Sequence, residues 1–106
     1  MTNNLSMISD NKREQVYACV QAISKYGFVK RLIVFGSAVT NDCKEDSDID
    51  HCVDMTEPTR GLHTYQMTVD LSNACNHNCD ILTYKKLHGK IKDEIDEKGV
   101  VVYELS

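Results

Sequence analysis

The spacing of hydrophobic residues predicts a helix and two strands in the first half of the chain. Apolar residues recur on one helical face between residues 10 and 26, namely Val16, Cys19, Val20 and Ile23. Gly27 is expected to end this helix in the left-handed conformation. The apolar run that ends at Phe35 predicts a buried strand over 28–35. A second strand is expected over 48–54, with Ile49 and Val53 in the core.

The second half of the chain predicts two more helices and two more strands. A weaker stripe predicts a helix through about residue 73, with Leu62, Tyr65 and Val69 inward and Met67 at the surface. A short strand over 80–83 should precede a final helix that Thr83 caps, on which apolar residues recur every fourth position: Leu87, Ile91 and Ile95. A last strand is expected over 100–105. These elements predict a small mixed β-sheet packed against helices, an α/β (α+β) fold, in one domain over residues 1–106.

Two aspartates open the second predicted strand. Asp48 and Asp50 are alternate residues, so they should share a face, about 7 Å apart at their Cα atoms. Neighbouring carboxylates repel, and each disfavours ionisation of the other. A divalent cation removes this conflict, and Mg²⁺ binds through one or two carboxylates while leaving other positions for substrate phosphates. The pair therefore predicts a metal site at the end of the sheet.

A glycine and a serine follow the first predicted strand. Gly36 allows the backbone to turn sharply and to approach a ligand closely. Ser37 is expected to cap a short helix whose backbone N–H groups point at a phosphate. Beside the acid pair, this turn predicts a site for a metal-bound nucleoside triphosphate. The alternative is a plain strand, turn and strand with acidic residues at the sheet edge, and either half of the motif alone would favour that interpretation.

Composition narrows the classes of partner. The 106 residues carry a net charge of −4, so a general electrostatic attraction to nucleic acid or to an anionic membrane is not expected. The sequence contains neither an apolar stretch long enough to span a bilayer nor the features of a signal peptide, and we expect a cytoplasmic protein.

The five cysteines are expected to be free thiols, since an odd number does not suit a disulfide framework. A zinc site around residues 75–79 is the alternative. No second pair of ligands has a matching spacing, and His51 and Cys52 should point to opposite faces of their strand. We therefore favour unliganded cysteines.

The spacing of Gly36-Ser37, ten residues, and then Asp48-Ile49-Asp50 resembles the signature of the polymerase-β-type nucleotidyltransferases. The resemblance is closest to the minimal nucleotidyltransferases (MNT) of bacteria and archaea, and the order of elements matches over most of the chain. It implies transfer of AMP from ATP to a hydroxyl with one or two Mg²⁺ ions. Asp48 and Asp50 would hold the metal, and Gly36 and Ser37 would grip the triphosphate. Asp80 would be a third carboxylate that completes a second metal position or takes the proton of the attacking hydroxyl.

The resemblance also implies a partner. Small nucleotidyltransferases of this kind are often paired with helical HEPN-type toxins, which implies an antitoxin that adenylylates a toxin tyrosine within a hetero-oligomer. A homo-oligomer remains open, and the acidic charge disfavours a nucleic-acid acceptor. Family members usually carry an arginine and a glycine shortly after Gly-Ser, where this chain has Ala38-Val39-Thr40-Asn41. The alternative is therefore a catalytically weak or inactive binding module that neutralises its partner by contact.

Overall fold

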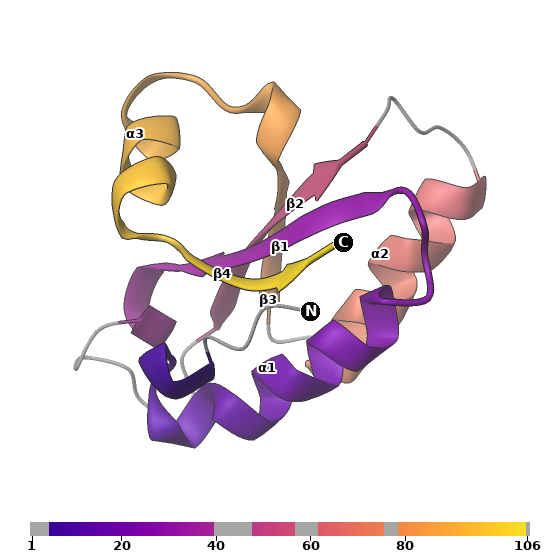
Figure 1. The fold of residues 1–106 in the computed structure, drawn as a ribbon, viewed down its shortest axis with the longest axis horizontal. Coiled ribbons are helices and arrows are strands. Elements are labelled where there is room, and N and C mark those ends of the chain that lie inside the picture. Colours follow the sequence, from indigo (N-terminus) through magenta and orange to yellow (C-terminus); the bar gives the residue numbers. More distant parts are fainter. Residues whose placement is uncertain (1–4, 40–47, 57–61, 76–78, 106) are drawn as a thin grey trace.

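A computed structural model describes residues 5–39, 48–56, 62–75 and 79–105 (Figure 1). The longer helices and strands follow one another along the chain in the predicted order. The longer elements are α1 (Asp10–Ile23), β1 (Val29–Phe35), β2 (Ile49–Met55), α2 (Leu62–Ala74), β3 (Cys79–Thr83), α3 (Gly89–Lys98) and β4 (Val100–Glu104). Three short 3₁₀ turns complete the description: η1 (Leu5–Met7), η2 (Gly36–Val39) and η3 (Tyr84–Lys86).

The four strands form one mixed sheet in the order β3-β2-β1-β4. β1 lies at the centre and pairs antiparallel with both β2 and β4. β2 and β3 are parallel, and α2 lies between them in the chain, as a parallel pair requires a crossover connection. This mixed sheet with helices confirms the predicted α+β fold class.

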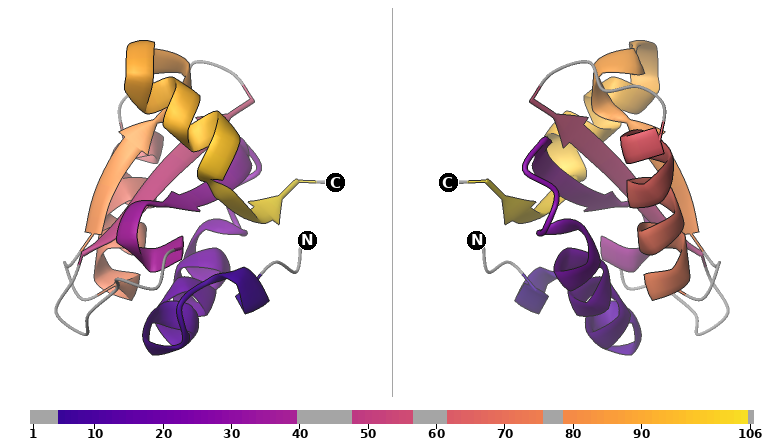
Figure 2. Two further views of the ribbon diagram at one scale, coloured as in Figure 1. Left: turned by 90° about the vertical axis from the view of Figure 1, so that its left-hand side faces the viewer. Right: turned by 90° about the vertical axis from the view of Figure 1, so that its right-hand side faces the viewer.

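The sheet separates two hydrophobic cores, because alternate residues of each strand face opposite sides. The larger core lies under α1 and α2, and the smaller one lies on the other side, where α3 packs (Figure 2). Ile49 and Val53 belong to the larger core, as predicted, and Cys52 belongs to the smaller one. The smaller core is built from Ile33, Phe35, Cys52 and Ile95.

Helix α1 confirms the predicted stripe but not its predicted end. Val16, Cys19, Val20 and Ile23 are all buried. The helix ends at Ile23, and the following Ser24 stays in the right-handed helical conformation. The expected left-handed Gly27 is wrong, since its φ is not positive. The chain instead leaves the helix through a turn in which the Tyr26 N–H donates to the Ile23 carbonyl at 3.1 Å.

Helix α2 is present, but the face predicted to be buried is wrong. Leu62 is 76% exposed and Tyr65 is 65% exposed, whereas Met67 and Leu71 are buried. α2 has a second apolar stripe, in which Met67 and Leu71 are spaced i, i+4, and this stripe faces the larger core. The next residue before Leu71, Asp70, accepts a hydrogen bond from the Tyr26 hydroxyl and forms an ion pair with Lys25 at 3.0 Å.

The last helix begins later than predicted. Thr83 precedes the turn η3, and α3 begins only at Gly89, so Thr83 is not its cap. Gly89 has a φ of +69°, a left-handed conformation that suits glycine, and the chain changes direction here. Ile95 is buried as expected, but Ile91 remains 41% exposed.

The cysteines agree only partly with the prediction. Cys19 and Cys52 are buried free thiols. Cys75 is disulfide-bonded, so the expected free thiol is wrong at this position; an odd number of cysteines still leaves room for one disulfide. Residues 76–78 of the zinc alternative lie outside the described residues. None of the described helices combines the length and hydropathy that crossing a membrane requires.

An ion pair joins β1 to β2 at the end of the sheet away from Gly36. Arg31 and Asp54 are register partners, and the guanidinium donates from both Nε and Nη2 to Oδ2 of Asp54, at 3.0 and 2.9 Å. Asp54 is only 4% exposed. The guanidinium also lies 4.9 Å from the centre of the Tyr84 ring.

We expect Asp54→Ala to lower the free energy of unfolding by about 3 kcal/mol, because it leaves the Arg31 charge half-buried without its partner. Urea denaturation measures this change. Asp10→Ala is the matched control, since it breaks an ion pair with Arg13 in which the Asp10 side chain is 91% exposed. It should change stability by less than about 0.5 kcal/mol. Equal losses in the two variants would contradict a structural role for the buried pair.

Candidate active site

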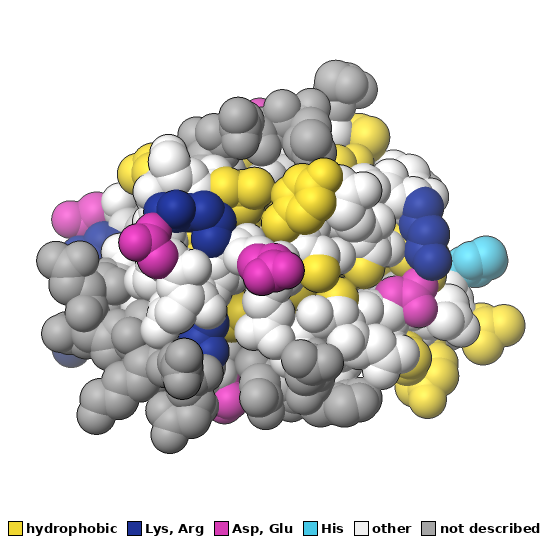
Figure 3. All heavy atoms as spheres, turned by 90° about the horizontal axis from the view of Figure 1, so that it is seen from below, with side chains coloured by type: hydrophobic (Ala, Val, Ile, Leu, Met, Phe, Trp, Pro, Cys, Tyr) yellow, Lys and Arg dark blue, Asp and Glu magenta, His cyan; other side chains and the backbone are white. Residues whose placement is uncertain are grey.

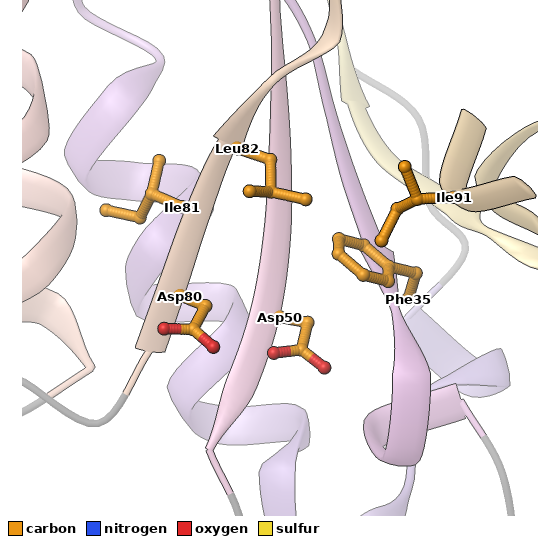
Figure 4. Close-up of a pocket in the computed structure, with 6 residues that line it drawn as sticks. All are labelled: Phe35, Asp50, Asp80, Ile81, Leu82 and Ile91. Carbon is orange, nitrogen blue, oxygen red and sulfur yellow. The ribbon is translucent and has the colours of Figure 1, made fainter. Parts of the chain in front are cut away.

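Two carboxylates from distant parts of the chain face each other across the parallel strand pair. Asp50 of β2 and Asp80 of β3 are register partners. Figure 4 shows both side chains on the same face of the sheet, at the mouth of a pocket. Asp50 is partly buried and Asp80 is exposed. Parallel pairing of β2 with β3 therefore brings together two acids that are thirty residues apart in the sequence.

Gly36 brings the backbone of the phosphate-binding candidate turn directly against Asp50. Gly36 follows Phe35, the register partner of Asp50, and has a φ of +74°. A Cβ atom at Gly36 would overlap with Oδ2 of Asp50, so this approach requires glycine. The turn η2 begins at Gly36 itself, which places Ser37 inside the turn. The expectation that Ser37 precedes and caps this turn is therefore wrong, because the left-handed glycine already starts it.

Asp50 is the carboxylate at the site whose ionised form is disfavoured by its surroundings. Burial raises the pKa of Asp50, and the neighbouring carboxylates of Asp80, Asp48 and Glu94 raise it further. Within the described residues, no lysine or arginine forms an ion pair with Asp50 or Asp80. The site thus holds negative charge that no described side chain neutralises.

Asp48 lies just before β2 and is exposed. Its charge reaches Asp50, but the described parts of the chain contain no group of three His, Cys, Asp or Glu side chains close enough to hold a metal ion together. The structure therefore pairs Asp50 with Asp80 and leaves Asp48 at the start of the strand.

A pocket of about 380 Å³ extends from the acid pair toward α3. Three apolar side chains from three elements converge in it: Phe35, Leu82 and Ile91 (Figure 4). The remaining lining residues are Asp50, Asp80 and Ile81. The sequence pattern assigned the apolar residues only to the core. The sequence did contain a signal that Leu82 and Phe35 belong to the site. Leu82 lies two residues after Asp80, so strand alternation places both on the same face, and Phe35 directly precedes Gly36.

The chain belongs to a nucleotidyltransferase family. The family model described as "Polymerase beta, Nucleotidyltransferase" matches residues 18–106, which include both acids of the pair, Gly36 and every strand of the sheet. The fold and the family thus define a nucleotidyltransferase domain.

Named relatives come from Methanocaldococcus jannaschii. "Putative protein adenylyltransferase MJ0435" is 35% identical over 83 residues, which are 78% of this chain and 88% of the relative. "Putative protein adenylyltransferase MJ0126" is 33% identical over 75 residues, which are 70% of this chain and 76% of the relative. This chain is therefore similar to proteins named for the transfer of adenylyl groups to proteins.

Solved structures with the same fold include chains of toxin–antitoxin complexes. A chain of a toxin–antitoxin complex with AMP-PNP matches with a TM-score of 0.65 at 12% identity, covering 92% of this chain and 75% of the other. A chain of the complex between a tri-AMPylated Shewanella oneidensis HEPN toxin and its MNT antitoxin matches with a TM-score of 0.57 at 15% identity, covering 90% and 71%. At these identities the likeness shows the fold.

The donor set fits the magnesium ion that the family implies. Mg²⁺ prefers carboxylate oxygens and binds through one or two of them, with substrate phosphates and water in its other positions. Asp50 and Asp80 supply two such carboxylates on facing strands, and their mutual repulsion is what a cation would relieve.

Proposed function

We propose that this protein is a Mg²⁺-dependent nucleotidyltransferase that moves AMP from ATP to a hydroxyl, the tyrosine hydroxyl of a HEPN-type helical partner. The observation that carries the proposal is the row formed by Gly36, Asp50 and Asp80 across three adjacent strands. This row combines a close backbone approach, suited to phosphates, with carboxylates suited to a divalent cation.

In this proposal Asp50 and Asp80 hold the metal, and Asp48 joins them from the start of β2. A bound Mg²⁺ supplies positive charge against the negative charge that grows on the phosphates during transfer. Gly36 keeps the backbone close enough for its turn, which includes Ser37, to hold the triphosphate. The exposure of Asp80 allows an incoming hydroxyl to reach it. Asp80 would take the proton as the oxygen attacks the α-phosphorus and the bond to the pyrophosphate leaving group breaks.

A separate protein as the acceptor fits the part of the chain that the structure describes. Its helices and strands are used to build one sheet with its two cores. The relatives named protein adenylyltransferase support a protein acceptor, and the complex of an AMPylated HEPN toxin with its MNT antitoxin supports a HEPN-type partner in a hetero-oligomer. On the face seen in Figure 3, acidic, basic and apolar side chains are interspersed, and the net charge of −4 disfavours nucleic acid as the acceptor.

One observation favours a second candidate function, a binding module that neutralises its partner by contact alone. The residue after Ser37 is Ala38, whose side chain is fully buried in the larger core. This position of the turn therefore offers no cation to the phosphates. A pure binding module would bind the partner equally well with and without MgATP.

The experiment incubates the protein, its genomic neighbour and Mg²⁺ with ATP labelled at the α-phosphate. We expect label on a tyrosine of the neighbour, located by mass spectrometry, and no transfer when EDTA removes the metal. Calorimetry with MgATP separates the two candidates. An absence of both transfer and magnesium-dependent nucleotide binding, with the partner complex intact, would contradict the enzyme and support the binding module.

A further inference from the structure

The pocket beside the acid pair has two chemically different ends. Its lower end in Figure 4 carries the carboxylates of Asp50 and Asp80. Its other end is lined by Phe35, Leu82 and Ile91. Ile91 is 41% exposed although it belongs to a helix that packs on the sheet. An apolar wall that remains open to solvent beside charged groups is typical of a ligand site.

The row of Gly36, Asp50 and Asp80 indicates how the attacking and leaving oxygens lie relative to the sheet. Gly36 directly follows β1, Asp50 lies on β2 and Asp80 lies on the edge strand β3. In phosphoryl transfer the attacking and leaving oxygens lie on opposite sides of the phosphorus, roughly in line. With the departing phosphates at the Gly36 end, the acceptor approaches from the Asp80 end, at the edge of the sheet. The reaction line therefore runs across the strands.

The nucleoside is attached to the phosphorus that is attacked. It therefore has to extend away from the line that joins the attacking and leaving oxygens. Along the strands, the pocket leads from the acids to the apolar end under α3. We propose that this apolar end, formed by Phe35, Leu82 and Ile91, holds the nucleobase of the donor nucleotide. The inference rests on the proposed function and adds the position of the base, together with the way in which the base is selected.

Selection of the base follows from the lining. Among the described residues that line the pocket, the polar side chains are those of Asp50 and Asp80, and both belong to the phosphate end. The apolar end offers a base contact surface without a described hydrogen-bonding side chain. Pockets of this kind discriminate by only about 10- to 200-fold, whereas sites that hydrogen-bond their substrate reach 10⁴-fold or more. ATP and GTP should therefore bind with affinities within about a hundredfold of each other.

The test measures binding to the full chain by calorimetry with Mg²⁺ and three probes: ATP, GTP and inorganic tripolyphosphate. Ile91→Ser removes apolar contact surface from the pocket at a partly exposed position. We expect it to weaken ATP and GTP about five- to tenfold, and to leave tripolyphosphate unchanged. Leu62→Ser is the matched control, since Leu62 is 76% exposed on α2, on the opposite side of the sheet. It should leave all three affinities unchanged.

The outcomes separate this inference from the proposed function. Unchanged nucleotide affinity in Ile91→Ser, equal weakening of tripolyphosphate, or a preference for ATP over GTP beyond about a hundredfold would overturn the inference alone. If the wild-type chain bound none of the three probes with Mg²⁺, both the inference and the proposed function would fall. Thermal unfolding of Ile91→Ser should match that of the control, which excludes loss of the fold as the cause.

Discussion

Asp50→Asn should lower the rate of AMP transfer by at least about a thousandfold while the protein remains folded. Asp50 is the acid at the centre of the site, between Gly36 on one side and Asp80 on the other. The substitution keeps the shape of the side chain but removes the charge that would hold the metal. Transfer of α-labelled AMP, measured at saturating partner, gives the rate. Asp93→Asn, at an exposed aspartate of α3 that does not line the pocket, is the control and should transfer normally.

The same variant has a second expected signature, in stability. The pKa of Asp50 is raised in the fold by burial and by the carboxylates of Asp80, Asp48 and Glu94, so the folded chain binds this proton more tightly than the unfolded chain. Ionisation of Asp50 therefore destabilises the fold, and the effect grows as pH rises from the ordinary value of 3.8 through the raised pKa. Metal-free Asp50→Asn should melt at a higher temperature than the wild type at pH 7, and the difference should disappear below that window.

With Mg²⁺ the wild type should melt at a higher temperature than Asp50→Asn, because only the wild type gains the full stabilisation from the bound cation. Melting curves at pH 7 with and without Mg²⁺ measure both effects. A variant that melts lower than the wild type without metal would show that Asp50 has a structural role, and its loss of transfer would then say nothing about the chemistry.

Gly36→Ala should lower the free energy of unfolding by about 3 kcal/mol and the transfer rate by about a hundredfold. Two causes combine at this position. A φ of +74° is unfavourable for alanine, and the added methyl group would overlap with Oδ2 of Asp50. Relief of that overlap requires Asp50 to move, which displaces a proposed metal ligand. Thermal unfolding and the labelled-AMP assay measure the two losses.

Two other glycines separate these causes. Gly89 has a similar φ of +69°, but a Cβ there would meet nothing within 4 Å, so Gly89→Ala should cost only about 1 kcal/mol. Gly27 does not have a positive φ, and a Cβ added there would meet no atom within 4 Å. Gly27→Ala should therefore change the free energy of unfolding by less than about 0.5 kcal/mol. Equal effects of Gly36→Ala and Gly89→Ala on stability and on AMP transfer would show that the close approach of Gly36 to Asp50 is not needed for function.

Local pattern was sufficient to predict the strands and the buried face of the first helix. The stripe of α1 is unambiguous, since its apolar residues are spaced along one face and all of them are buried. In β2 the alternation of Ile49 and Val53 with polar residues already defines the core face. These features depend on residues close together in the sequence, where hydrophobic period and backbone geometry act directly.

Other features depended on contacts between distant residues. α2 has apolar residues on two faces, and only packing against the larger core shows that Met67 and Leu71 are the buried ones. The site follows the same rule. The sequence predicts Asp48 and Asp50 on one strand, but the pairing of Asp50 with Asp80 requires the parallel register of β2 and β3, which local pattern does not contain. Likewise, the turn η2 begins at Gly36 in a left-handed conformation, so Ser37 lies within the turn and does not cap it as expected.

The place of β3 in the sheet has a consequence for how the protein responds to heat. Among the described strands, β3 is a five-residue edge strand that pairs with β2 alone, whereas β1 is held on both sides. Short edge elements open locally at a lower free energy than central strands, and their amide hydrogens exchange sooner. The proposed acceptor end of the site, at Asp80, is therefore held less firmly than the proposed phosphate end at Gly36. On warming, group transfer should fail by fraying of this strand while the hydrophobic cores are still intact.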